Sequence, residues 1–166
     1  GLTEVTSLSL EVIRENRPAI ALYQSLGFCV ARELCGYQGK LVEPRTELAD
    51  DSLDGLLCAV YRGPAENTPW QLDPLCFPSL PCRVVKDGEH AWGVIATLTA
   101  TPQLRYLFVD PAHRRQGLAR QLLQKINAQY PGIGTPVAVP SAFSSLFEGA
   151  GFKEMVIAQY EMVRTP

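Results

Sequence analysis

The sequence has 166 residues, of which 46% are hydrophobic and 19% are charged, and its formal net charge is −2. This length suffices for one full hydrophobic core, with roughly forty residues left over. The near-neutral charge argues against nucleic acid as a partner. No apolar stretch is long enough to span a membrane and no signal-peptide pattern is present, so we expect a cytoplasmic protein without a membrane partner. The five cysteines form no C-x-x-C pair, so we expect reduced thiols and no metal site.

The first forty residues contain a unit that returns near the end of the chain. In residues 8–34, Asn16 is a typical N-cap, Pro18 fits a first helical turn, and Gly27-Phe28 ends the helix and begins an apolar segment. Residues 137–160 repeat this order, with Gly151-Phe152 at the corresponding place. Both copies are predicted to form a strand, a helix and a second strand.

The central part of the chain changes character. Residues 45–51 are polar, and Ser52–Tyr61 has the pattern of a short amphipathic helix. Residues 62–81 contain five prolines, which exclude a long regular element. This segment is either a loop over a binding site or a simple linker.

The remaining elements follow at regular spacing. Cys82–Lys86 and Ala91–Leu98 are predicted to form a β-hairpin around the turn Asp87-Gly88, and Leu104–Val109 the next strand. Residues 118–130 carry an apolar stripe at helical spacing, which Pro131-Gly132 ends. Pro136–Val139 is predicted to be a further strand.

The junction between the strand ending at Val109 and the helix starting at Leu118 predicts an anion site. Such a loop offers unpaired backbone N–H groups and the positive end of a helix dipole. Gly117 lets the backbone approach a ligand, and Arg114 and Arg115 add charge-assisted contacts. The alternative is an ordinary helix start with solvated arginines.

The run L-R-Y-L-F-V-D-P-A-H-R-R-Q-G-L-A-R-Q-L-L at residues 104–123 resembles the signature of the GNAT superfamily of acyl-CoA N-acyltransferases. Its pattern Q/R-x-x-G-x-G/A is matched at Arg114, Gly117 and Ala119, and the resemblance extends from about Cys82 to the C-terminus. It implies an α/β fold with a mixed, mostly antiparallel central sheet that splays at the fourth strand, often through a bulge, between flanking helices. It also implies acetyl-CoA as the acyl donor.

The resemblance assigns expected roles to particular residues. The strand residues Leu107, Phe108 and Val109 would contact the pantetheine arm through their exposed backbone. The pyrophosphate would be held by the loop residues Arg114, Arg115, Gln116, Gly117, Leu118 and Ala119. Arg120 would touch the adenosine-side phosphate or lie on a solvated face. Phe147 would adjoin the cofactor in the last helix, where many relatives carry a tyrosine.

The catalytic groups are less well matched. Transfer to an amine needs a base, stabilisation of a tetrahedral intermediate and a proton for the thiolate. Phe147 has no proton to give, so Tyr106 is the candidate donor, on condition that its side chain faces the splayed gap. Glu89 and His90 are either a base or a surface turn pair. Two functions stay open: an N-acetyltransferase that acts by direct transfer on a small-molecule or protein amine, and a non-catalytic acyl-CoA-binding or structural module.

The first copy of the repeat resembles the closing half of a GNAT domain, N-x-x-A-x-x-L-Y-x-x-x-G-F, at Asn16, Leu22, Tyr23, Gly27 and Phe28. Tyr23 keeps the tyrosine in a copy without a cofactor loop. We therefore expect the C-terminal part of a longer tandem-GNAT protein; the alternative is a short protein with an added strand-helix-strand unit. The expected divisions are 1–45 (closing half of a first domain), 46–81 (helix and connection) and 82–166 (GNAT core). The apolar side chains of the first unit need a receiving surface on the C-terminal domain or on a second copy in a homodimer.

Overall fold

The computed structural model describes residues 6–45, 48–63, 68–98 and 101–165, which form two antiparallel four-stranded sheets with flanking helices. The first sheet has the order β3 (Ala49–Asp51), β4 (Cys82–Asp87), β5 (Ala91–Ala96), β6 (Gln103–Val109). The second has the order β1 (Leu8–Ile13), β8 (Lys153–Arg164), β2 (Cys29–Gln38), β7 (Val139–Pro140). The helices are α1 (Arg17–Ser25), α2 (Leu53–Tyr61), α3 (Leu118–Gln129) and α4 (Ser144–Gly149). Short 3₁₀ segments are η1 (Trp70–Leu72), η2 (Pro74–Ser79), η3 (Pro111–His113) and η4 (Ser141–Phe143).

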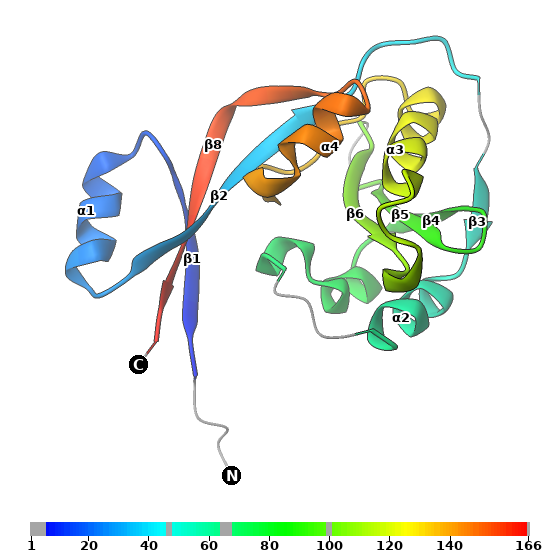
Figure 1. Cartoon of the computed structure of the whole chain (residues 1–166). Helices are drawn as coiled ribbons and strands as arrows, with labels where there is room; N and C mark the ends of the chain where they lie inside the picture. Colours follow the sequence, from blue (N-terminus) through cyan, green and yellow to red (C-terminus); the bar gives the residue numbers. More distant parts are fainter. Residues whose placement is uncertain (1–5, 46–47, 64–67, 99–100, 166) are drawn as a thin grey trace.

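The first sheet is covered on both faces, so its central strand β5 is buried throughout. On one face α3 contributes Leu122, Leu123 and Ile126 to the larger core cluster. On the other face, Leu56 of α2 and Phe77 of η2 belong to a second cluster. The α3 helix lies so close to β5 that a Cβ at Gly93 would be 2.7 Å from Ile126 Cδ1. The sheet is therefore the middle of three layers (Figure 1).

The two sheets meet at one point and diverge from it. Gly134 forms a parallel bridge with Gln103 at the start of β6 and an antiparallel bridge with Gln38 at the end of β2. The Leu104 N–H donates to the Gly134 carbonyl over 2.9 Å. Beyond this joint no described strand pairs with the outer side of β6, because β7 pairs with β2. This is the splayed sheet that the sequence predicted.

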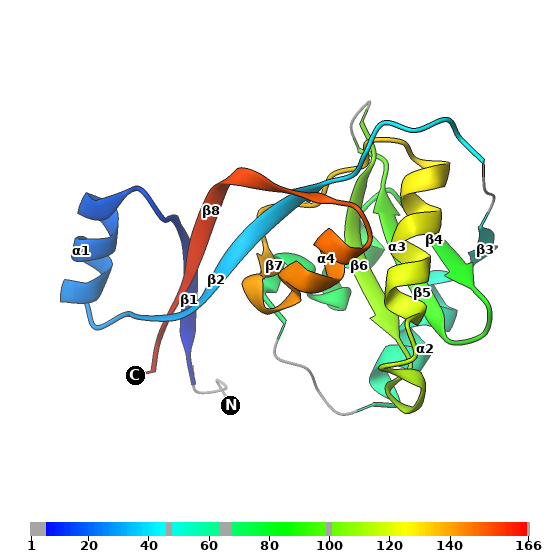
Figure 2. The ribbon, with the colours of Figure 1, turned by 45° about the horizontal axis from the view of Figure 1, so that its top comes forward.

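The second sheet interleaves an N-terminal unit (residues 8–38) with a C-terminal unit (residues 137–164). The N-terminal unit supplies β1 and β2, the C-terminal unit supplies β7 and β8, and the order β1-β8-β2-β7 alternates between them. The outer ends of β2 and β8, with β1 and α1, extend away from the α/β body (Figure 2). Helix α1 buries none of its residues, and Leu22 and Leu26 are 56% and 49% exposed.

Local features of the repeat agree with the predictions. The Asn16 side chain accepts the Ala19 N–H at 3.2 Å, and a proline occupies the first turn of α1. Gly27 and Gly151 have φ values of +86° and +93°, the left-handed conformation expected where a helix ends. Ser52 caps α2 through the Gly55 N–H.

Other predictions need correction. Of Pro136–Val139 only Val139 joins a strand, because β2 pairs with Val139 through Cys35 and with the following Pro140 through Leu34. Ala49–Asp51, at the end of the polar stretch, form the short strand β3, for which no prediction was made. The proline-rich segment forms η1 and η2 and no long element, as predicted, although Pro64 lies outside the described residues. In the described parts of the chain, no helix combines the length and apolar character that a membrane span requires.

Candidate functional site

A cleft of about 970 Å³ occupies the divergence between the two sheets. One wall is β6 and the start of α3, and the other is formed by β7, η4 and α4, with Arg32 and Glu33 of β2. Thr68, Pro69 and Leu72 of the proline-rich segment border it as well. The unpaired edge of β6 therefore faces a space large enough for an extended ligand.

A bulge in β6 lies on the cleft wall. Val94 pairs with Tyr106, and the next residue of β5, Ile95, pairs with Leu104, so Arg105 is the extra residue on β6. A bulge bends its strand and redirects the side chain. Arg105 consequently lines the cleft, whereas Leu104 and Tyr106, which flank it in β6, are buried.

The loop after β6 exposes the start of α3 to this cleft. Gly117 is the N-cap residue with a φ of +84°, and among the described residues no side chain caps the helix. The first backbone bond of the helix runs from the Gln121 N–H to the Gly117 carbonyl, so the preceding N–H groups have no partner within the helix. Arg114 is held in position because its Nε donates to the Val109 carbonyl at 3.0 Å. This end of the helix is suited to binding an anion.

The cleft is basic although the chain as a whole is slightly acidic. Glu33 is the one carboxylate among the described lining residues, and it forms an ion pair with Arg14. The arginines that line the cleft are Arg32, Arg105, Arg114, Arg115 and Arg120. Arg120 lies at the junction of α3 and α4, where a Cβ on Gly149 would be 2.9 Å from its guanidinium. This charge distribution favours a polyanionic ligand.

The structure brings nearly all predicted site residues to this cleft. Those that line it are Tyr106, Leu107, Phe108, Val109, Arg114, Arg115, Gly117, Leu118, Ala119 and Phe147. Gln116 is exposed in the loop and is not among them. The Tyr106 ring belongs to the second core cluster, with its centroid 5.4 Å from that of Phe77. Phe147 stacks on Tyr37 with a centroid distance of 4.4 Å and meets Phe152 edge-on.

The candidate bases from the β4–β5 turn lie outside the cleft lining. Glu89 is exposed and pairs with Lys86 at 2.9 Å, which lowers the pKa of its carboxyl group. The His90 ring stacks on His113. Tyr23 lies on α1, in the part of the chain that extends away from the body, and contacts Phe28.

Sequence reasoning missed a half-buried polar network beside the cleft. Glu11 accepts a hydrogen bond from Gln71, and the Gln71 carbonyl accepts one from Arg105 at 3.1 Å. Glu11 lies opposite Glu161 in the β1–β8 register, and Glu161 pairs with Arg32. Burial raises the pKa of Glu11, and the nearby Glu161 adds to that rise. The four ionisable groups come from four strands, so no short sequence pattern identifies them.

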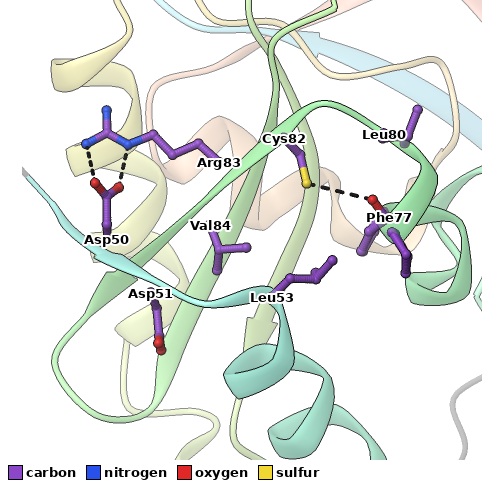
Figure 3. Close-up of a pocket in the computed structure, with 9 residues that line it drawn as sticks. Asp50, Asp51, Leu53, Phe77, Leu80, Cys82, Arg83 and Val84 are labelled. Atoms are coloured by element: carbon purple, nitrogen blue, oxygen red, sulfur yellow. Dashed lines mark hydrogen bonds and ion pairs between the residues drawn. The ribbon is translucent and has the colours of Figure 1, made fainter.

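A second hollow of about 370 Å³ lies between β3, β4 and η2 (Figure 3). The Arg83 guanidinium pairs with Asp50 at its rim, and the Cys82 thiol donates to the Phe77 carbonyl at 3.9 Å. Burial raises the pKa of Cys82, which disfavours the reactive thiolate. Its polar groups satisfy one another, and the larger cleft is therefore the candidate site.

Comparisons with known proteins agree with this geometry. Residues 79–154 match the family model described as the acetyltransferase (GNAT) domain. A GCN5-related N-acetyltransferase from Sphaerobacter thermophilus aligns over 96% of this chain and 59% of its own, at 12% identity and a TM-score of 0.65. A GNAT-family acetyltransferase from Colwellia psychrerythraea aligns over 95% of this chain and 65% of its own, at 20% identity and a TM-score of 0.55. No curated protein matches the sequence.

At these identities the solved structures are similar in fold alone. The chain therefore has the GNAT fold, and its residues 79–154 match the model of the GNAT acetyltransferase domain. It spans about three fifths of the length of these two structures, 59% and 65%.

Proposed function

We propose that this chain is an N-acetyltransferase that moves an acetyl group from acetyl-CoA directly to an amine of a small molecule or a protein. The observation that carries the proposal is the uncapped start of α3 at Gly117, open to a basic cleft beside the unpaired edge of β6. The match of residues 79–154 to the GNAT domain supports it.

The cofactor would lie along β6. The backbone of Leu107, Phe108 and Val109 would pair with the amide groups of the pantetheine arm, as an added strand does. The pyrophosphate would meet the N–H groups and side chains of the loop Arg114–Ala119, and Phe147 would lie beside the thioester. The arginine-rich lining of the cleft supports an anionic cofactor.

In the reaction, the amine nitrogen attacks the thioester carbonyl carbon, the C–S bond breaks, and the CoA thiolate leaves and takes up a proton. The ammonium form of the acceptor must first lose a proton to a base or to water. Tyr106, which lines the cleft, is the proposed proton donor to the thiolate. Glu11 is a candidate base or relay, because burial raises its pKa towards the range of a useful base and its network adjoins the cleft.

The test is an acetyl-transfer assay with a panel of amines, with the release of free thiol as the readout. We expect Phe147→Tyr to raise the transfer rate about tenfold or more with CoA affinity unchanged, because general-acid help is typically worth about 10²–10⁴-fold when fully aligned. Phe28→Tyr adds the same hydroxyl to a phenylalanine outside the cleft lining and should have no effect. Tyr106→Phe should lower the rate.

The alternative is a non-catalytic module that binds acyl-CoA or supports a partner domain. The phenylalanine at position 147 favours it, since this side chain cannot protonate a thiolate. Tight CoA binding without turnover by the wild type and by Phe147→Tyr, across the amine panel, would establish this alternative and refute the enzyme.

We also propose that residues 1–45 are the closing half of a first GNAT domain and residues 82–166 the core of a second. The alternating strand order β1-β8-β2-β7 supports two related units that exchange strands. The exposed apolar residues of α1 would then be covered by the rest of the first domain or by a second copy of the chain. Light scattering distinguishes these outcomes, since a homodimer doubles the mass.

A further inference from the structure

Three potential metal ligands gather at one end of β5 and β6, beside the cleft. They are His90 in the turn before β5, Asp110 directly after β6, and His113 in η3. The Nδ1 atom of each histidine is 3.5 Å from Asp110 Oδ2. The three ligand atoms lie within 4.8 Å of one another, and each side chain keeps roughly two fifths of its surface exposed.

The backbone fixes the three positions relative to one another. The β5–β6 register pairs Ala91 with Val109, and the Asp110 N–H donates to the His90 carbonyl at 2.9 Å. The His113 N–H in turn donates to the Asp110 carbonyl at 2.8 Å. Asp110 Oδ1 accepts the Ala112 N–H at 3.3 Å, which leaves Oδ2 directed towards the imidazoles. The Asp110 carboxylate is thus oriented by the fold.

Among the described residues, one side-chain atom of this cluster is buried without a hydrogen-bond partner. At 3.5 Å, neither Nδ1 is within normal hydrogen-bond distance of the carboxylate. His113 Nδ1 is buried and makes no hydrogen bond within the described structure. The two rings are stacked, with centroids 3.5 Å apart and planes 7° from parallel, so their Nδ1 atoms approach the same carboxylate oxygen. One cation between them would satisfy all three groups.

The separation of these atoms fits a tetrahedral transition metal. Bonds of about 2.0–2.1 Å from zinc to nitrogen or oxygen place two ligand atoms roughly 3.3 Å apart, close to the observed 3.5 Å. Binding one ion requires the stacked rings to separate, since two imidazoles on one tetrahedral ion have their centroids roughly 5 Å apart, against 3.5 Å here. Imidazole ligands favour zinc, nickel, copper or iron over magnesium and calcium, which prefer oxygen ligands.

We propose that His90, Asp110 and His113 bind a divalent transition-metal ion, with zinc as the natural candidate, and leave a coordination position for water or for an anion. His113 also lines the cleft and directly precedes Arg114. The ion would therefore add positive charge beside the loop Arg114–Ala119. This consequence for CoA affinity rests on the proposed function, whereas metal binding itself does not.

The test is a titration of the folded chain with Zn²⁺ and Co²⁺ after chelator treatment and alkylation of exposed thiols. We expect one ion per chain by calorimetry, and no binding of Mg²⁺ in the same concentration range. Because the chain has two histidines, both belonging to this cluster, Co²⁺ should broaden both imidazole C–H signals in the NMR spectrum together. His90→Ala, His113→Ala and Asp110→Asn should each weaken metal binding at least tenfold.

Glu89→Gln is the matched control, since Glu89 is an exposed carboxylate of the same turn and should leave metal affinity unchanged. Asp110→Asn keeps an N-cap side chain for η3, so it tests the ligand without removing the cap. Absence of Zn²⁺ binding at millimolar concentration, or binding that survives both histidine substitutions in folded variants, would overturn the proposal. Metal binding without any change in CoA affinity would refute only the coupling to the cleft.

Discussion

Replacing Gly117 by alanine separates the stability of the loop from its ability to bind an anion. Gly117 has a φ of +84°, and a Cβ built there would meet no atom within 4 Å. The substitution should therefore lower the free energy of unfolding of the ligand-free chain by only about 1–2 kcal/mol, the cost of an alanine in the left-handed conformation. For a chain of this size that corresponds to roughly 2–4 °C in Tm per kcal/mol. The space that the Cβ enters belongs to the cleft, where the proposed pyrophosphate lies.

The loss of CoA affinity should consequently exceed tenfold, or about 1.4 kcal/mol of binding free energy. Gly27→Ala is the matched control, because its φ is +86°, its Cβ would make an ordinary 3.7 Å contact with Arg164, and it lies at the end of α1. Both variants should melt at similar temperatures, and only Gly117→Ala should lose CoA in calorimetry. Unchanged CoA affinity in Gly117→Ala would refute the assignment of this loop to the pyrophosphate.

Three further predictions concern the fold and the network beside the cleft. Cys35 is 2% exposed, and burial raises the pKa of its thiol to about 11. Peptide mapping after iodoacetamide treatment of the native chain should therefore find Cys35 unmodified, whereas the exposed Cys29, Cys58 and Cys76 should react. A chain that begins at Glu43 lacks β2 with its buried Leu34, Cys35 and Tyr37, so its circular dichroism should show no cooperative melting. A chain that begins at Cys29 keeps β2 and should still fold. A Glu43 chain as stable as the full chain would contradict this prediction. Glu11 has a raised pKa, so its stabilising contribution is present at low pH and is lost as the pH rises through that pKa. Glu11→Gln should therefore raise the Tm at pH 8 and hardly change it at pH 4. The control Glu15→Gln, at an exposed carboxylate, should leave the Tm unchanged at both pH values.

Local signals in the sequence were sufficient for the features that depend on neighbouring residues. The capped start of α1 at Asn16, the left-handed glycines Gly27 and Gly151, and the helix start at Gly117 each follow from the conformational preferences of a few adjacent residues. The hairpin around Asp87-Gly88 belongs to the same class, with Gly88 at a φ of +62°. These features define the predicted anion loop, which is why most of the expected lining residues do meet in the cleft.

Features that depend on strand order were not predictable in this way. Glu11 and Glu161 are neighbours because β1 pairs with β8, although they lie at opposite ends of the sequence. Strand β7 has two paired residues, since its partner β2 belongs to the N-terminal unit and meets it at Leu34 and Cys35. The interleaving of the two units is decided by tertiary packing.

This interleaving makes the cleft depend on both the N-terminal and the C-terminal unit. Phe147, on the wall opposite β6, is supported by the buried ring of Tyr37 in β2, and the Tyr37 hydroxyl is 2.8 Å from Ser144 Oγ at the start of α4. Arg32, also on β2, is a lining residue itself. A ligand that bridges the two walls must therefore stabilise the docking of β2, because it binds only the assembled form. By the same linkage, whatever covers the exposed face of α1 would favour the assembled cleft.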